Sequence, residues 1–518
     1  MFKAVAVSTL VSLLTLVPYG LAAIQVKPDG VFGGFLVNPV DGFSYLAKMR
    51  QGYEGQWLFR LPYTVEPGEG TFIFIYFLFL GHLSRWMGIP SIYLYHLVRF
   101  LGSVFMYSTA FILVAKLLRT KILRWWAYGI LLVGGGFGWI GLPFGLLASD
   151  LWIVESIPFL TAYANAHFPL AAALFLALVL IMLLKNRASY LDMSAAILLS
   201  TLLAAIQPFS MVTLFVFLFL WLVWETWIEA KEREGFLWKN AMRGKWLLYL
   251  AMMAGALPWF IYDYWVTVHH PQIAAWNAQN VTPSPPIFNY ILGFGGIFIL
   301  AIFGIVKGQF RTKREERLLL VWVIAQALLL YAPFDLQRRL SLGLYFALVI
   351  LAIITLDKIK LNPRKLHLVL PVLLILSIPS NLVVIGSGIA GVIKKDPFVV
   401  LDKNEMKAYQ WLSSNADQDE IILAGPSAGN RIPAFANLRV FYGHPFETVN
   451  AEEQRIFVEE AFSAENFHDR SIEELQRIGV SYVFYGPEER ALGRPEWLEI
   501  LEVIYVSGEY SIYEISTP

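Results

Sequence analysis

The 518-residue sequence contains no cysteine. Disulfide bonds, cysteine metal ligands and cysteine nucleophiles are therefore excluded. Net charge is almost absent as well, because 40 basic residues are balanced by 39 acidic ones. A nearly neutral chain has no overall electric field that would attract a nucleic acid, so any partner must be inferred from local sites.

Charged residues are scarce, and apolar residues take their place. Asp, Glu, Lys and Arg make up 15% of the chain, hydrophobic residues make up 57%, and the mean hydropathy is +0.58. These values are too apolar for a soluble protein of this size and predict a polytopic α-helical membrane protein. The membrane region carries no nucleotide-binding, zinc-protease or serine-hydrolase signature. Its glycine run at 134–138 lies within a predicted span, where small residues let helices approach closely.

Hydropathy predicts about eleven transmembrane helices. They are expected at 1–24, 92–117, 125–147, 168–184, 194–206, 209–228, 246–266, 290–306, 318–333, 340–356 and 368–386. Lysine and arginine cluster in alternate loops, and the positive-inside rule places those loops in the cytoplasm. The N-terminus is then cytoplasmic, and the C-terminal residues are extracytoplasmic.

The apolar run at 71–80 decides this topology. It has about ten residues, whereas a spanning helix needs roughly 20. Counting it as a span would place the basic turn at 116–124 outside, against the positive-inside rule. The run is therefore predicted to be a juxtamembrane helix within a long first external loop, residues 25–91.

Residues 1–24 admit two interpretations. The small residues near Ala22 would suit a signal peptidase, so the segment could be a cleaved signal peptide. Its single lysine favours an uncleaved first helix instead. Under either alternative residue 25 emerges on the outer side, and the remaining topology is unchanged.

From about residue 394 the composition becomes that of a soluble domain. Helices are predicted at 404–415 and 471–478, and strands at 420–424, 481–485 and 509–515. Strands that alternate with helices predict a small α/β domain. The predicted organisation is a transmembrane domain at 1–393 followed by an extracytoplasmic α/β domain at 394–518.

Asp41 opens the first external loop directly after an apolar segment, where a carboxylate needs a specific role. Apolar and aromatic residues from Phe43 to Tyr53 recur near helical spacing, so Asp41 is predicted to be the N-cap of an amphipathic helix on the membrane. A capping carboxylate can still face a cavity, and Asp41 is therefore the leading catalytic candidate. Glu66 is a weaker candidate, because it lies in a turn where solvated acids are common.

A second external loop, about 148–167, contains Asp150, Glu155 and His167. Acids and a histidine that converge from two loops could hold a divalent cation or share acid–base work. A histidine at the start of a helix can equally be a hydrogen-bonded structural residue.

His269 and His270 resemble a metal-binding pair only superficially. Adjacent loop histidines have no fixed ligand geometry without partners, so a surface loop is the favoured interpretation. The prolines at 271–286 are expected to exclude helix from this loop.

Arg338 and Arg339 lie in the one external turn that breaks the charge pattern. Two adjacent arginines at the outer mouth of a helix pair work against the insertion preference, so they indicate an anionic partner. Guanidinium groups bind phosphate bidentately, and the phosphate of a lipid carrier would lie at this depth. The alternatives are snorkelling to the lipid headgroups or an ion pair with Asp335.

Together these features resemble the GT-C superfamily of membrane glycosyltransferases, which includes oligosaccharyltransferase catalytic subunits, protein O-mannosyltransferases and lipid A aminoarabinose transferases. The resemblance covers about residues 1–390. Its short motifs are Asp41 followed by Tyr45-Leu46-Ala47, the juxtamembrane helices and the second acidic loop. The resemblance implies that Asp41 is the first-loop catalytic acid. It also implies that Glu155 or Asp150 is a second-loop acid and that the arginine pair contacts carrier phosphate.

The sequence departs from the GT-C pattern in two places. The second-loop Asp-X-Asp motif is absent, since the stretch reads Ala164-Asn165-Ala166-His167, and the identity of any divalent cation is left open. Residues 425–433 with Arg439 fall about where oligosaccharyltransferases carry Trp-Trp-Asp-Tyr-Gly, which is missing here. Sequon recognition is therefore not expected. His444, Glu447 and Asn450 follow, and they could face the membrane site.

The resulting hypothesis is a GT-C-type glycosyltransferase that moves a hexosyl or pentosyl group from a polyprenyl-phosphate donor to an acceptor at the outer membrane face. The predicted catalytic residues are Asp41 and Glu155, and the predicted substrate-binding residues are Arg338, Arg339, His167, Tyr45 and Glu66. The expected partners are the lipid-linked donor and membrane lipids, and the compact loops suit a prokaryotic plasma membrane.

Two alternatives remain open. One is a GT-C-like scaffold or sensor without catalysis, which the incomplete second-loop motif would allow. The other is a transporter or flippase of a lipid-linked saccharide, which predicts charged residues within spans and two similar halves.

Overall fold

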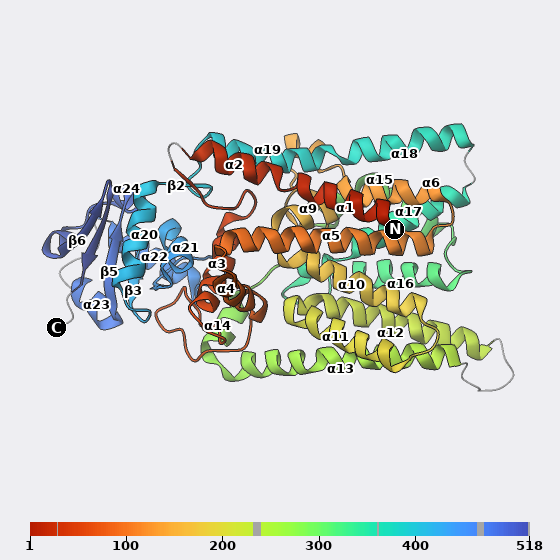
Figure 1. The fold of residues 1–518 in the computed structure, drawn as a ribbon, viewed down its shortest axis with the longest axis horizontal. Helices are drawn as coiled ribbons and strands as arrows, with labels where there is room; N and C mark the ends of the chain where they lie inside the picture. The colour runs from red at the N-terminus through yellow and green to blue at the C-terminus, as the bar shows by residue number, and fades with distance from the viewer. Residues whose placement is uncertain (28–29, 232–239, 360–361, 464–470, 516–518) are drawn as a thin grey trace. The chain divides into compact units, whose positions relative to one another are not determined.

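The computed structural model describes residues 1–27, 30–231, 240–359, 362–463 and 471–515. The chain divides into two compact units (Figure 1). Unit 1 comprises Met1–Pro18, His96–Tyr262 and Thr282–Ser387, and unit 2 comprises Tyr19–Tyr95, Asp263–Val281 and Gly388–Pro518. Unit 2 thus groups the predicted first external loop with the C-terminal residues, and the boundary at 393/394 stays a prediction.

Among the residues described, eight helical segments are long and apolar enough to cross a membrane, or nine if one bent pair counts as a span. The eight are Phe2–Val26, Ser91–Leu117, His167–Leu184, Pro208–Lys231, Met242–His269, Ile287–Val306, Gln337–Lys358 and Arg364–Ile393. The two other predicted spans correspond to α11 (Tyr190–Ile206) and α16 (Arg314–Leu329), which have 17 and 16 residues. The polytopic helical class is confirmed, whereas the number of spans stays a prediction.

The helices of unit 1 pack around α17 (Leu344–Lys358). Every residue of α17 from Leu344 to Leu356 is buried, and the helix packs against α15 (Ile287–Val306), α16 and α6 (Lys121–Val133). The other long helices that lie wholly or mainly in this unit are α1 (Phe2–Leu14), α5 (Ser91–Leu117), α10 (His167–Leu184), α12 (Pro208–Lys231), α13 (Asn240–His269), α18 (Pro363–Ser377) and α19 (Pro379–Ile393). A helix buried on all sides must be apolar on all sides, and α17 has that composition.

The glycine run breaks the span that the sequence predicts at 125–147. α6 ends at Val133, and α7 (Gly138–Gly141) resumes at an angle of 45°. A Cβ at Gly136 would lie 2.2 Å from the carbonyl oxygen of Gly293, so only glycine permits this close approach to α15. The expectation of close helix approach therefore fits. The span predicted at 125–147 is a bent helix pair, and its crossing of the membrane as one span stays a prediction.

Arg99 is a buried cation within the apolar helix α5. Its guanidinium donates hydrogen bonds to the carbonyl oxygens of Ala162 and Tyr163, at 2.8 and 2.6 Å. These carbonyls belong to the last residues of α9 (Pro158–Ala164), where helical carbonyls lack intrahelical partners. Arg99 thus ties the second external loop to α5.

The C-terminal part of unit 2 is a five-stranded sheet with helices on both faces (Figure 1). The strand order is β4-β3-β5-β7-β6, with β3 parallel to β4 and β5 and the remaining pairs antiparallel. The strands are β3 (Ile421–Leu423), β4 (Arg439–Val440), β5 (Val480–Tyr485), β6 (Glu502–Ser507) and β7 (Tyr510–Glu514). The predicted α/β domain is confirmed, including its predicted strands at 420–424, 481–485 and 509–515.

Two apolar clusters hold this sheet between its helices. One joins α20 (Lys403–Asn415) and α21 (Pro426–Ala436) to one face, through residues such as Tyr409 and Phe484. The other joins α22 (Ala451–Phe462) and α23 (Ser471–Ile478) to the opposite face, through residues such as Phe462 and Val483. Successive strand residues point to opposite faces, so both faces of a covered sheet are apolar.

The first-loop part of unit 2 contains two packed helices, α3 (Pro39–Tyr53) and α4 (Ile75–Met87). A Cβ at Gly52 would lie 2.0 Å from the carbonyl oxygen of Leu78, and one at Gly81 would lie 1.9 Å from that of Met49. The two glycines therefore permit backbone contact between the helices. α4 has 13 residues and is absent from the candidate spans of the described chain, in line with the predicted juxtamembrane helix.

Proline does not exclude helix from the loop after α13, so that expectation is wrong. α14 (Pro271–Gln279) begins at Pro271, where the missing N–H costs nothing because the first-turn N–H groups have no intrahelical acceptor. His270 precedes it, and its Nδ1 accepts a hydrogen bond from the Ile273 N–H at 3.3 Å. This histidine is thus a helix cap at the start of α14, where the sequence predicted only a surface loop.

Candidate active site

Asp41 lies in the first turn of α3. The helix begins at Pro39 after Asn38, whose φ of 48° makes the turn into the helix. Asn38, and not Asp41, is therefore the N-cap residue, which corrects the prediction. The Asp41 side chain is 43% exposed, and the unpaired N–H groups and dipole of a helix N-terminus stabilise a carboxylate at this position.

His444 pairs with Asp41. Its Nε2 lies 3.3 Å from the Asp41 Oδ1, and its side chain is buried. The Nδ1 of the same ring accepts hydrogen bonds from the backbone N–H groups of Phe446 and Glu447, at 3.1 and 3.2 Å. A nitrogen that accepts two hydrogen bonds carries no proton, so in the neutral ring the proton is on Nε2 and points at Asp41.

The turn that carries His444 is held by Thr448. The Thr448 Oγ1 accepts hydrogen bonds from the N–H groups of Gly443 and His444, at 3.2 and 3.0 Å, and the Thr448 N–H donates to the His444 carbonyl at 3.0 Å. Gly443 also lies against Gly429 of α21. A Cβ at Gly443 would be 2.5 Å from the Gly429 carbonyl oxygen, so glycine permits this contact. These contacts fix the backbone on both sides of the histidine.

A largely buried ion pair lies about two turns further along α3, with the Lys48 and Glu447 side chains 1% and 14% exposed. The Lys48 Nζ donates to both carboxylate oxygens of Glu447 at 2.8 Å and to the Ser44 Oγ at 2.5 Å. The Ser44 hydroxyl donates in turn to Glu447 at 2.5 Å. Asp41, Ser44 and Lys48 are three and four residues apart, and this spacing places them on one face of the helix.

The charge state of Glu447 follows from these contacts. Burial acts to raise the pKa of Glu447, but the nearby Lys48 and His444 and the hydrogen bonds from Lys48 and Ser44 outweigh it and lower the pKa below its ordinary value. The carboxylate is therefore ionised at neutral pH, and it anchors the His444 turn to α3.

Aromatic rings surround the Lys48 ammonium group. It lies 4.5 Å from the centre of the Phe74 ring and 5.7 Å from those of Phe59 and Tyr45. Cation–π attraction and the Glu447 carboxylate together compensate for the lost hydration of this lysine, whose side chain is only 1% exposed. Tyr45 is also stacked on Phe77, with ring centres 4.7 Å apart. Tyr45 is therefore a packed member of the aromatic cage, the three rings of Tyr45, Phe59 and Phe74 around Lys48.

Tyr63 completes this neighbourhood. Its ring centre is 5.8 Å from that of His444, and its hydroxyl donates to the Asn430 carbonyl at 3.2 Å. Burial, with the negative charges of Glu447 and Asp41, raises the pKa of Tyr63 well above its ordinary value, so the phenol stays neutral. The segment 425–433, noted in the sequence for its position, forms the start of α21, where Asn430 also donates to the Val40 carbonyl at 3.3 Å.

Unit 1 holds the second-loop residues, and Asp150 has a structural role there. Its Oδ2 accepts hydrogen bonds from the N–H groups of Gly136 and Gly138, at 2.9 and 3.2 Å. Burial raises the pKa of Asp150 to about 6, although hydrogen bonds from Ser380 and these glycines oppose the shift. This carboxylate therefore satisfies backbone N–H groups in the non-helical segment between α6 and α7.

Glu155 and Arg338 belong to one neighbourhood within unit 1. The Tyr290 hydroxyl at the start of α15 lies within electrostatic range of both side chains. The Arg338 guanidinium stacks over the Trp152 ring of the second loop, 4.8 Å from its centre, and the Arg338 N–H donates to the Thr282 carbonyl at 3.2 Å. Glu155 is buried. A site that Glu155 and Arg338 share with Asp41 stays a prediction.

Arg339 points elsewhere. Its guanidinium lies 5.9 Å from the ring centre of Phe209, at the start of α12, whereas Arg338 contacts the second loop. The two side chains therefore contact different elements. His167 begins α10 and is buried with its ring against Phe168, at 3.9 Å between ring centres.

The remaining candidates are spread over the chain. Glu66 is exposed in unit 2. Across the described ranges, no group of three or more His, Asp or Glu side chains is arranged to hold a metal ion. Sequence reasoning missed Ser44 and Lys48, although their spacing from Asp41 along one helical face was a usable signal.

Neither a protein-family model nor a curated protein sequence matches the chain. Solved structures match it at low identity. The oligosaccharyltransferase of Archaeoglobus fulgidus, tethered to an acceptor peptide with an NVT sequon, aligns with a TM-score of 0.56 at 13% identity, over 94% of this chain and 69% of its own. ArnT from Cupriavidus metallidurans, bound to undecaprenyl phosphate, aligns with a TM-score of 0.52 at 13% identity, over 98% of this chain and 97% of its own.

A third similar structure is the arabinofuranosyltransferase AftD from mycobacteria. It aligns with a TM-score of 0.53 at 13% identity, over 100% of this chain and 40% of its own. All three alignments extend over nearly the whole of the present chain, so the likeness concerns its complete fold.

Proposed function

We propose, on the premise that the chain has the GT-C-like fold of these three proteins, that it is a membrane glycosyltransferase with a polyprenyl-phosphate-linked sugar as donor. The observation that carries the proposal is the half-exposed Asp41 carboxylate held by the buried His444. A fixed carboxylate that remains open to solvent has the geometry of a general base. ArnT binds undecaprenyl phosphate, and the archaeal oligosaccharyltransferase binds dolichol-phosphate, which supports a carrier of this class here.

In the proposed reaction Asp41 accepts the proton of an acceptor hydroxyl. The hydroxyl oxygen forms a bond to the anomeric carbon of the donor sugar, and the bond from that carbon to the carrier phosphate breaks. The electron pair leaves with the polyprenyl phosphate, and the configuration at the anomeric carbon inverts. Phosphate is already a good leaving group, so positioning and charge compensation supply most of the catalysis.

Arg338 is the proposed group that compensates the phosphate charge. A guanidinium is permanently charged and can donate two parallel hydrogen bonds to phosphate oxygens. Its stacking on Trp152 orients the guanidinium plane before the donor binds. Glu155 would then orient Arg338 or the donor from the second loop. The outer membrane face is the proposed location, because the positive-inside rule places both loops there.

The direct test uses purified protein in detergent with a radiolabelled polyprenyl-phosphate sugar. A glycosyltransferase releases the carrier phosphate and labels an added acceptor. A scaffold or sensor binds the donor without releasing the carrier, and a flippase moves the intact lipid across a reconstituted bilayer. Either of these results would refute the proposed activity.

Replacing Arg338 by glutamine is expected to lower kcat/KM for the donor by about 10–100-fold, the value of a charge-assisted hydrogen bond of roughly 1.5–3 kcal/mol. Arg339→Gln removes the same charge from the next residue, whose side chain contacts Phe209 instead. Its effect is expected to be much smaller. Donor-dependence curves for the two variants measure the difference, and equal losses would show that the turn acts only through its net charge.

His444→Phe is expected to lower transfer by about tenfold or more, because it removes a hydrogen bond to a carboxylate, worth roughly 1.5–3 kcal/mol. His444→Gln should keep most activity, since its amide can donate to Asp41 from nearly the position of Nε2. Initial rates and thermal unfolding of both variants are the measurements. If His444→Gln lowers the transfer rate as much as His444→Phe does, and its stability is unchanged, the histidine does more than donate a hydrogen bond to Asp41.

A further inference from the structure

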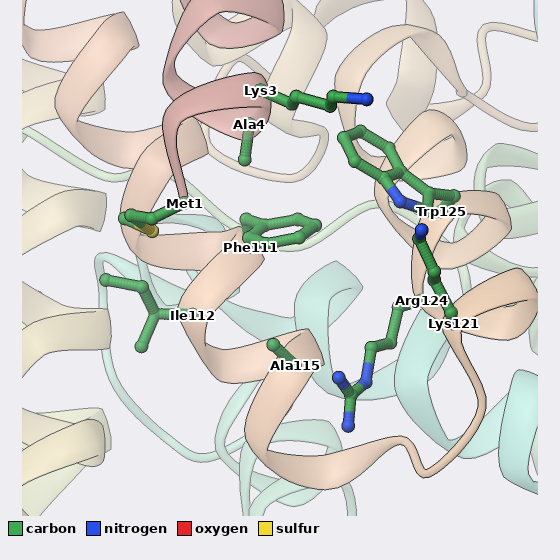
Figure 2. Close-up of a pocket in the computed structure, with 9 residues that line it drawn as sticks. All are labelled: Met1, Lys3, Ala4, Phe111, Ile112, Ala115, Lys121, Arg124 and Trp125. Carbon is green, nitrogen blue, oxygen red and sulfur yellow. The ribbon is translucent and has the colours of Figure 1, made fainter.

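A pocket of about 500 Å³ lies between three helices of unit 1, α1, α5 and α6, and it is lined by none of the candidate active-site residues (Figure 2). Three of its lining residues are cations: Lys3 near the start of α1, and Lys121 and Arg124 in the first turn of α6. Its other lining residues are apolar or aromatic, including Phe111, Ile112 and Trp125. The pocket thus combines a cationic rim with an apolar wall.

Among the residues that the structure describes, no acidic side chain lines the pocket beside these cations. Residues 1–28 and 96–149, which supply α1, most of α5 and α6, contain no Asp or Glu at all. The lining of the pocket is therefore net positive, which favours an anionic ligand.

Two of the three basic side chains are open to solvent, and the third is held by a backbone carbonyl. The Arg124 Nε donates to the Leu118 carbonyl at 2.8 Å, which fixes the guanidinium near the turn between α5 and α6. Lys3 and Lys121 are both exposed. Figure 2 shows the three basic side chains projecting from α1 and α6.

The position of the pocket indicates the source of the anion. α1 begins at Phe2, α5 ends at Leu117 and α6 begins at Lys121, so the cations lie at the ends of apolar helices, at the depth of lipid headgroups. A free phosphate ion would use only the cations. The apolar surface of Phe111, Ile112 and Trp125 contributes to the free energy of binding only if the ligand also carries a hydrocarbon chain that covers it.

We propose that this pocket binds an anionic phospholipid, with the headgroup phosphate on Lys3, Lys121 and Arg124 and the start of an acyl chain along Phe111 and Trp125. Basic pockets between membrane helices recognise anionic lipids in this manner. The lipid would clamp α1 to the α5–α6 pair, because the cations of the site come from both.

The test is titration of the full-length protein in detergent micelles with phosphatidylglycerol or phosphatidylcholine, read as retained lipid by native mass spectrometry. Phosphatidylglycerol is expected to bind in preference. The Lys3→Gln/Lys121→Gln variant should weaken its binding by about 25-fold, or about fivefold for each cation near the lipid surface. The matched control is Lys116→Gln/Arg119→Gln, which removes two exposed cations of the adjacent turn that do not line the pocket. This control should bind as the wild type does.

Three outcomes would overturn the proposal. Equal losses in the two variants would mean that only general surface charge attracts the lipid. Complete displacement of phosphatidylglycerol by millimolar inorganic phosphate would mean that the pocket recognises a free anion. Equal retention of phosphatidylcholine would mean that the cations do not select. Thermal unfolding without lipid verifies that both variants are folded.

Discussion

Replacing Asp41 by asparagine is expected to lower kcat/KM for sugar transfer by about 10²–10⁴-fold, the usual contribution of a general base. Asparagine has the same size as aspartate, and its amide oxygen can still accept the His444 Nε2–H. The substitution therefore removes the ability to take a proton while keeping the contact between α3 and the His444 turn. The measurement is the rate of carrier-phosphate release from a labelled polyprenyl-phosphate sugar.

Two companion variants make this result specific. Glu69→Gln removes an exposed acid from the same loop and should leave the rate within twofold. In the Asp41→Asn/His444→Phe double variant the two losses should not add, because the histidine acts through the carboxylate. A correctly folded Asp41→Asn protein with nearly full activity would contradict the assignment of Asp41 as the base.

Lys48→Met is expected to reduce the free energy of unfolding by about 3 kcal/mol, because it leaves the largely buried Glu447 carboxylate without its cation. Methionine fills a similar volume among Phe59, Phe74 and Tyr45, so lost packing adds little. The expected loss exceeds that of any surface substitution. Chemical or thermal unfolding in detergent, followed by near-ultraviolet circular dichroism, measures it.

The pH dependence of this loss has a definite sign. The pKa of Glu447 is lower in the folded protein than its ordinary value of 4.5. The ion pair therefore contributes fully above pH 4.5, and its contribution disappears as the pH falls through the lowered folded pKa. The difference in the free energy of unfolding between wild type and Lys48→Met should therefore become smaller over that acidic range.

The Lys48→Met/Glu447→Gln variant should recover much of the lost stability, since it removes both charges together. Lys407→Met, which replaces an exposed lysine of α20, should change stability by no more than about 0.5 kcal/mol. If the double variant is as unstable as Lys48→Met alone, the lysine stabilises the cage through packing and not through Glu447.

Several features of the fold were predictable because they depend on local chemistry. Runs of apolar residues predicted membrane helices, and the structure contains long apolar helices near most of the expected positions. Alternation of strands and helices after residue 394 predicted the α/β domain, and α20, β3, β5 and β7 lie where expected. The short motifs around Asp41 predicted a GT-C-like fold, and the chain aligns over nearly its whole length with the oligosaccharyltransferase and ArnT structures.

The differences between prediction and structure arose where local rules admit two outcomes. Proline ends a helix in the middle of a sequence but starts one at its first turn, and Pro271 starts α14. Glycine inside an apolar run can permit either close packing or a break. Gly136 and Gly138 form a break because the Asp150 carboxylate accepts their N–H groups.

The sequence by itself determined that this is a polytopic membrane protein with an α/β domain, because hydropathy and periodicity are properties of neighbouring residues. It also singled out Asp41. Only the tertiary structure decided what Asp41 and Lys48 contact, since His444 and Glu447 are 403 and 399 residues away along the chain. Local patterns carry no information about such pairs, which form only when the fold removes Lys48, His444 and Glu447 from water and so makes each depend on a charged or hydrogen-bonding partner.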